Sequence, residues 1–184
     1  MARPSCKASI LEAAERVVVR DGAAHLTLDA VAEEAGLSKG GVLYHFPSKS
    51  ALLEGMLEAL LSYYAAQREA AAQQSEEQGR YFRAELAAGL PEKPNQSKRL
   101  VGNAILAVIA NEPRLIDQCR AFHEERYKQS CGNDLQDLDR LSVILAMDGL
   151  IMLELLQISP FTPDQRERIR EHLVETGKKL LSRE

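Results

Sequence analysis

The chain has 184 residues, 45% hydrophobic and 27% charged, which is ordinary for one globular domain or two small ones. Its net charge of −4 excludes a uniformly basic surface but not a local basic patch. No apolar run is long enough to span a bilayer, and the first residues lack the apolar centre of a signal peptide. Cys6, Cys119 and Cys131 have no metal-type spacing, which predicts reduced thiols in a cytoplasm and no metal site. No cofactor is expected either.

The first predicted element is an amphipathic helix from about Ser5 to Arg20. Its apolar positions are Ile10, Leu11, Ala14, Val17 and Val18. Asp21 and Gly22 end the helix. Arg3, Lys7, Lys39 and Lys49 are cations of the first fifty residues that could share one face.

Residues 27–46 predict a helix, a sharp turn and a second helix. Thr27 is a good N-cap, and an apolar stripe at helical spacing follows it. Gly36 stands where a left-handed residue ends a helix, and Ser38 caps the next one. Pro47 then ends the second helix, because proline disfavours the helical conformation of the residue before it. Ser48 is the expected N-cap of a long helix whose apolar stripe continues to Tyr64.

Ser75 and Gln78 have capping-box spacing and predict the start of a further helix, which runs to Pro91. A strongly apolar helix follows over about residues 100–109. Asn111, Glu112 and Pro113 predict the start of the next one as cap, first and second helical positions.

Residues 135–158 form the most hydrophobic predicted helix, which is apolar on nearly every side. This pattern indicates a central helix or one covered by a partner. Thr162 as cap and Pro163 as first residue begin the last helix. No segment alternates with a period of two. The sequence therefore predicts an all-α protein of roughly nine helices.

Residues from about 5 to 61 resemble the DNA-binding domain of the TetR family of transcriptional regulators. The resemblance rests on Thr27, on residues 35–40, on residues 44–49 and on Leu52. It implies a helix-turn-helix domain at 1–48 and an effector-binding and dimerisation domain at 49–184. It further implies a homodimer on a palindromic DNA operator, acting as a repressor released by a small-molecule effector.

The resemblance and the chemistry of the residues together predict the DNA contacts. They are Thr27, Ser38, Lys39, Gly40, Gly41, Leu43, Tyr44, His45, Ser48 and Lys49. Helix N-termini favour a phosphate at Thr27 and Ser48, although simple capping explains both residues too. Lys49 is a cation at a helix N-terminus, which is unfavourable unless a phosphate lies nearby. Lys39 can donate to guanine or to a phosphate.

Three further features of this segment leave alternatives open. Gly40 and Gly41 each cost about 1 kcal/mol in a helix relative to alanine, which predicts close approach to DNA or to a neighbouring helix. Tyr44 and His45 can contact the DNA backbone or pack against the first helix. Leu43 stands where the family usually has a tyrosine, so it could meet a thymine methyl group instead of a phosphate.

For the effector we expect a largely apolar cavity. Its candidate residues are Tyr63, Tyr81, Phe82, Asn103, Phe122, His123, Tyr127 and Met147. Ordinary core packing is the alternative for each of them. The candidate dimer interface consists of Leu145, Leu150, Leu153, Ile169, Leu173 and Leu180.

Two other functions compete with a DNA-binding regulator. A helical-bundle enzyme or small-molecule binding protein would need a catalytic constellation, and the sequence has no nucleophile–base pair, phosphate loop or metal spacing. A protein-interaction adaptor would use the apolar C-terminal helices. The sequence therefore favours a regulator without enzymatic activity.

Overall fold

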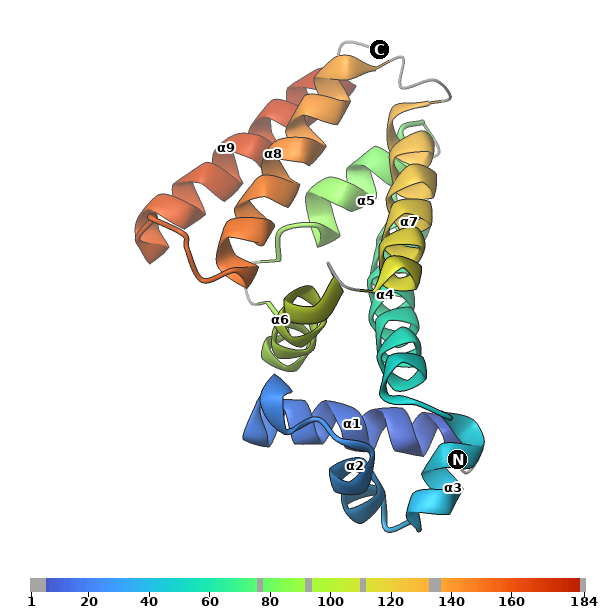
Figure 1. Ribbon diagram of the computed structural model, residues 1–184. Helices are drawn as coiled ribbons and strands as arrows, with labels where there is room; N and C mark the ends of the chain where they lie inside the picture. Colours follow the sequence, from blue (N-terminus) through green and yellow to red (C-terminus); the bar gives the residue numbers. More distant parts are fainter. Residues whose placement is uncertain (1–5, 76–77, 92–93, 110–111, 133–136, 183–184) are drawn as a thin grey trace. The chain divides into compact units, whose positions relative to one another are not determined.

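The computed structural model describes residues 6–75, 78–91, 94–109, 112–132 and 137–182. Every regular element in these ranges is a helix (Figure 1), so the predicted all-α fold is confirmed. The elements are α1 (Cys6–Asp21), η1 (Ala23–His25), α2 (Leu28–Ala35), α3 (Lys39–His45), α4 (Lys49–Gln73), α5 (Arg80–Ala88), α6 (Gln96–Ile109), α7 (Pro113–Cys131), α8 (Leu138–Leu155) and α9 (Pro163–Leu181). None of these helices is long and apolar enough to cross a membrane.

Two predicted helix starts need correction. The capping box at Ser75 and Gln78 is wrong, because the Ser75 hydroxyl donates back to the carbonyl oxygen of Ala71 at 2.9 Å. Helix α5 begins instead after Gly79, whose φ of 66° suits a residue without a side chain. Helix α8 begins at Leu138, where the carboxylate of Asp137 accepts from the amide of Arg140; residues 135 and 136 lie outside the described residues.

The described chain divides into two compact units. The first comprises Met1–Ser62 and Asn95–Cys119. In it α1 packs against α2 and α6, and α2 packs against α3. The core side chains Ile10, Val17 and Val42 are fully buried there. Because α6 belongs to this unit, the limits of the unit differ from the predicted domain boundary after residue 48. That boundary separates the DNA-binding from the effector-binding domain by function, and it remains a prediction.

The second unit comprises Tyr63–Pro94 and Arg120–Glu184. Helices α8 and α9 run side by side and α5 packs against α9 (Figure 1). Gly177 permits this second contact, because a Cβ atom there would lie only 2.4 Å from Cδ2 of Leu86. The core of this unit includes Phe82, Ile144 and Met147.

Candidate nucleic-acid interface and interior of the second unit

The turn between α2 and α3 is fixed by local hydrogen bonds. The hydroxyl of Thr27 accepts from the amide of Ala30, and that of Ser38 accepts from the amide of Gly41, both at 3.1 Å. Gly36 ends α2 in the left-handed conformation, with φ of 66° and ψ of 32°. The predicted helix-turn-helix is therefore confirmed, with Thr27 and Ser38 as N-caps and Gly36 as the C-cap of α2.

Helix α3 is anchored on one face and free on the other. Val42 is fully buried, and Phe46 just beyond the helix is 2% exposed. Tyr44 is 85% exposed and touches His45 edge-on, with ring centroids 5.1 Å apart. Leu43 and His45 are half-buried. Packing of Tyr44 against α1 is thus excluded, and its ring faces solvent from an anchored helix.

The two glycines of α3 are not required by packing within the chain. A Cβ atom on Gly40 would come no closer than 3.9 Å to its nearest neighbour, the hydroxyl of Ser38. On Gly41 the nearest neighbours would be Ser38 and Leu37, at 3.5 and 3.8 Å. These are ordinary contact distances, so close approach of a neighbouring helix does not explain the glycines. The alternative of the sequence analysis, close approach to DNA, stays a prediction.

One lysine begins α3 and is paired with a carboxylate, and a second lysine begins α4. The Nζ atom of Lys39 lies 3.0 Å from Oδ2 of Asp29 on α2. Lys49 is exposed at the first position of α4, directly after Ser48. The Ser48 hydroxyl caps α4 by accepting from the amide of Ala51 at 3.1 Å. A cation at this helix N-terminus is unfavourable by itself, and an anion bound there would remove the cost.

Two arginines of α1 pair with an acidic residue of α2. Arg16 and Arg20 each place a guanidinium nitrogen 2.6 Å from a carboxylate oxygen of Glu34. The hydrogen bonds from Arg16 and Arg20 lower the pKa of Glu34. Both arginines are thus occupied by carboxylates of their own unit. The cations nearest to α3 in the sequence are Lys39 and Lys49. Arg3 lies outside the described residues.

The predicted effector residues fall into three groups. Phe82 and Met147 are fully buried in the core of the second unit, so they correspond to the packing alternative. Asn103 belongs to the first unit and is not grouped with the others. The remaining candidates, Tyr63, Tyr81, Phe122, His123 and Tyr127, are half-buried in the second unit. Of these, His123 meets the ring of Phe122 edge-on and the ring of Tyr127 at a tilt, with ring centroids 5.5 and 5.6 Å away.

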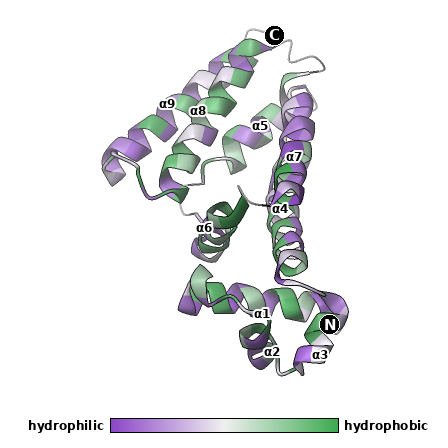
Figure 2. Cartoon of the chain, viewed as in Figure 1, coloured by the Kyte–Doolittle hydropathy of each residue, from purple (hydrophilic) through white to green (hydrophobic). Residues whose placement is uncertain are grey.

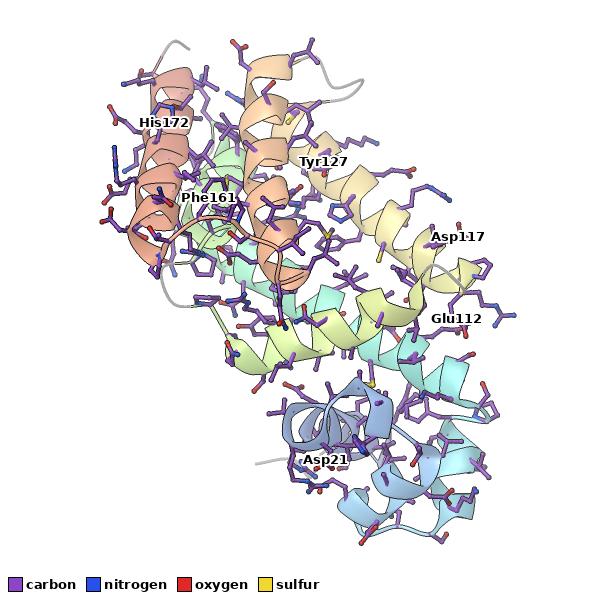
Figure 3. All side chains as sticks on the ribbon, turned by 60° about the vertical axis from the view of Figure 1, so that its left-hand side comes forward. Asp21, Glu112, Asp117, Tyr127, Phe161 and His172 are labelled. Atoms are coloured by element: carbon purple, nitrogen blue, oxygen red, sulfur yellow. The ribbon has the colours of Figure 1, made fainter. Side chains whose placement is uncertain are left out.

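The interior of the second unit contains a charged network that the sequence analysis missed. Arg126 on α7 binds Glu85 of α5 through Nε and Nη2, the shortest distance being 2.7 Å. Its Nη1 binds both carboxylate oxygens of Asp148 on α8, at 2.8 and 2.9 Å. Tyr127, on the α7 face toward α8 (Figure 3), donates to Oδ2 of Asp148 at 2.8 Å. One guanidinium thus joins three helices.

A second arginine extends the network to α4. Arg68 places Nη1 3.2 Å from Oε1 of Glu85 and donates through Nη2 to Gln129 at 2.8 Å. Its guanidinium also lies over the ring of Tyr81, 5.9 Å from the centroid. In the sequence Arg126 follows Phe122 and His123 at helical spacing, and this position on an apolar stripe was the available signal for a buried charge.

Burial and charge shift three ionisation equilibria here. Burial disfavours the charged form of Arg126, but the hydrogen bonds and charges of Glu85 and Asp148 outweigh it and raise its pKa above the ordinary value. Burial, followed by the bond to Asp148, raises the pKa of Tyr127 to about 12. Burial and then the charge of Arg126 lower the pKa of His123. No group of three or more His, Cys, Asp or Glu side chains within the described ranges could hold a metal ion.

The predicted interface residues differ in exposure. Leu150 is 4% exposed in the core of the second unit, so its inclusion in a surface available to a partner is corrected. Leu145 is 50% exposed, whereas Leu153, Ile169, Leu173 and Leu180 are half-buried. The exposed apolar residues Leu138, Met152 and Leu156 share the helical face of Leu145. Hydrophobic residues recur along α8 in Figure 2.

Comparison with known families agrees with this architecture. The model of the tetracyclin repressor-like C-terminal domain matches residues 79–177, more than half of the chain. The model of bacterial regulatory proteins of the tetR family matches residues 10–56. The second match covers the whole helix-turn-helix.

Individual relatives extend the comparison. The transcriptional regulator TtgR of Pseudomonas putida is 41% identical over 54 residues, which are 29% of this chain and 26% of that protein. The match therefore spans about a quarter of the curated relative. A TetR transcription regulator from Haloarcula marismortui has the same fold, with a TM-score of 0.74, 18% identity and coverage of 95% and 97% of the two chains. A regulator from Rhodococcus sp. Rha1 gives 0.73, 18%, 94% and 96%. The chain belongs to the TetR family of bacterial transcriptional regulators.

Proposed function

We propose that the protein is a cytoplasmic, homodimeric repressor that binds a palindromic operator through α3 and leaves it when a small molecule binds the second unit. The observation that carries the proposal is the build of α3. Val42 and Phe46 hold the helix against its unit, while Tyr44 is exposed on the opposite face. TetR-family regulators are in general DNA-binding proteins without enzymatic activity, and we extend this to the present chain.

The proposed DNA contacts divide by their chemistry. Thr27, Ser48 and Lys49 bind phosphates, since two helix N-termini and an exposed cation serve one anionic backbone. Gly40 and Gly41 allow the backbone of α3 to approach the groove. The side chains that reach toward the DNA are Ser38, Lys39, Leu43, Tyr44 and His45.

The proposed dimer contact uses the exposed face of α8. Leu138, Leu145, Met152 and Leu156 form an apolar stripe there, and a row of this kind is typical of an interface between copies. Gly149 is exposed on the same face, and a Cβ atom on it would meet nothing within 4 Å. The missing side chain lets a second helix approach closely. Half-buried residues of α9, such as Ile169 and Leu173, would flank the contact.

The proposed effector site lies beside the half-buried aromatic side chains of α7. His123 and Tyr127 offer polar groups next to ring surfaces, which is the usual composition of a small-molecule site. The buried network around Arg126 supplies charge at its edge.

A salt titration of binding to the DNA upstream of the protein's own gene tests this function. A specific complex should form, and the logarithm of its association constant should fall linearly with the logarithm of salt concentration. A shuffled DNA of the same length is the control and should bind far more weakly. Absence of a specific complex at every salt concentration would overturn the proposal.

A further inference from the structure

Three polar groups on one face of α7 point to the chemistry of the effector. Residues three and four positions apart lie on the same face of a helix, so His123 shares a face with Arg126 and Tyr127. Arg126 and Tyr127 both donate to the carboxylate of Asp148. The Nδ1 atom of His123 is buried and has no hydrogen-bond partner among the described residues. A buried polar atom in this state is unfavourable, and a ligand that bonds to it removes the cost.

Asp148 is the replaceable member of this arrangement. Its side chain is 22% exposed, compared with 8% for Arg126 and 2% for Glu85. Arg126 would keep its place without Asp148, because Glu85 still accepts from Nε and Nη2. The carboxylate of Asp148 can therefore turn toward solvent while the guanidinium stays oriented and charged.

Charge decides which ligand would take the vacated position. With Asp148 in place, Arg68 and Arg126 balance Glu85 and Asp148. Once the carboxylate of Asp148 leaves, the network carries one positive charge, which an anion neutralises. A cationic ligand at Asp148 would instead lie beside the Nη1 atom of Arg126, 2.8 Å from the carboxylate, and like charges at such range repel.

The surroundings define the remainder of the ligand. Phe122, His123 and Tyr127 present aromatic surfaces next to the three polar groups. We propose that the effector is an organic anion, an aromatic or apolar body carrying a carboxylate that replaces the Asp148 carboxylate on Arg126, Tyr127 and His123. The inference rests on the proposed function and specifies the effector class. The exchange would also release α8, which carries the proposed dimer stripe, from its polar bonds to α7.

Calorimetric titration of the full-length protein with three related probes tests the effector class. The probes are 1-naphthoate, its neutral amide 1-naphthamide and the cation 1-naphthylmethylammonium. We expect naphthoate to bind about tenfold more tightly than either other probe, equivalent to about 1.4 kcal/mol. Tighter binding of the cation, or no binding of naphthoate at millimolar concentration, would overturn the proposal.

Variants separate replacement of Asp148 from a general charge effect. Asp148→Asn weakens the internal competitor and should tighten naphthoate binding by about tenfold. Asp139→Asn removes the same charge from an exposed position of α8 and should change the affinity by less than about twofold. Tyr127→Phe should weaken naphthoate binding by about threefold to tenfold through loss of one hydrogen bond. Equal affinities of the wild type and Asp148→Asn for naphthoate would overturn the replacement.

Operator binding keeps the two proposals distinguishable. If the wild-type protein forms the specific DNA complex but does not bind naphthoate, the effector class is wrong and the repressor function stands. If no specific DNA complex forms, the repressor function fails whatever the probes do. Circular dichroism melting of Asp148→Asn and Tyr127→Phe identifies any variant whose fold is lost, and the comparison of the three probes on the wild type does not depend on it.

Discussion

The ammonium of Lys39 at the start of α3 is bound to the carboxylate of Asp29 in the first turn of α2, with Nζ 3.0 Å from Oδ2. If Lys39 contacts DNA as proposed, the DNA competes with Asp29 for this cation. We predict that Asp29→Asn raises affinity for operator and unrelated DNA about twofold to fivefold, since exposed ion pairs contribute up to about 1 kcal/mol. Fluorescence anisotropy measures both affinities. Glu33→Gln, an exposed carboxylate of the same helix, is the matched control and should have a smaller effect.

The role of Lys39 itself is tested by its removal. If Lys39 reads a base, Lys39→Ala should change the preference at one operator position by about 1–3 kcal/mol. Selection of binding sites from a randomised operator measures this preference. Uniform weakening across all sequences would assign Lys39 to the phosphate backbone instead.

Lys49 should behave as a phosphate ligand. We predict that Lys49→Ala weakens binding to all DNA sequences and lowers the salt slope by about one, because one counterion fewer is released. Lys179→Ala, an exposed lysine of α9 paired with Glu175, removes the same charge from the second unit and should leave the slope unchanged. An unchanged slope in Lys49→Ala would contradict a phosphate contact.

Local features of the helix-turn-helix and of the start of α4 were predictable because their bonds connect residues close in sequence. Thr27, Ser38 and Ser48 each accept from the amide three residues ahead, so a hydroxyl at the right offset suffices to locate the cap. Ser75 has the same spacing to Gln78 but bonds back to the preceding turn. A local pattern cannot distinguish these outcomes when two helix ends lie so close together.

The interior of the second unit was not predictable, because its bonds connect distant parts of the chain. Arg126 meets Glu85 and Asp148, residues 41 and 22 positions away. Nothing in their separate surroundings marks them as partners. Because α8 has apolar residues on nearly every side, its sequence also did not show that Leu150 faces the core while Leu145 faces solvent. Only the packing of α8 against its neighbours determines which side is covered.

The buried network should be necessary for stability. We predict that Arg126→Met lowers the free energy of unfolding by about 3–5 kcal/mol, because Glu85 and Asp148 lose their partner and Glu85 is 2% exposed. Adding Glu85→Gln should restore part of the loss by removing a buried charge. Urea unfolding measures both. Arg16→Met breaks an ion pair between exposed Arg16 of α1 and Glu34 of α2 and should cost less than about 1 kcal/mol; an equal loss in both variants would refute a special role for burial.

The stripe on α8 should control assembly. We predict that Leu145→Glu gives a folded monomer, because the side chain is 50% exposed within one chain. Leu150→Glu should instead unfold the second unit, since that side chain is buried in its core. Sedimentation velocity and thermal melting distinguish the two results. Ile116→Glu, at an exposed position on α7, is the control and should remain dimeric; a dimeric Leu145→Glu would disprove this interface.

His123 should make stability depend on pH. Its folded pKa lies below the unfolded value because burial, and then the charge of Arg126, disfavour the imidazolium. The unfolded chain therefore binds more protons once the pH falls below the unfolded pKa of about 6.5. The contribution of neutral His123 to stability is therefore present above the unfolded pKa and is lost as the pH falls through the folded pKa. We thus expect the urea concentration at the unfolding midpoint to decrease when the pH is lowered from about 7.5 to 5.5.

Replacement of His123 isolates its share of this dependence. His123→Gln cannot take up the proton, so its urea midpoint should fall less over the same interval than that of the wild type. Carboxylates titrate in both proteins and cancel in the difference. His172→Gln, at an exposed site on α9 (Figure 3), should retain the wild-type dependence. If His123→Gln and His172→Gln follow the same curve as the wild type, the imidazole of His123 is solvated and cannot be the unsatisfied group that the proposed carboxylate would bind.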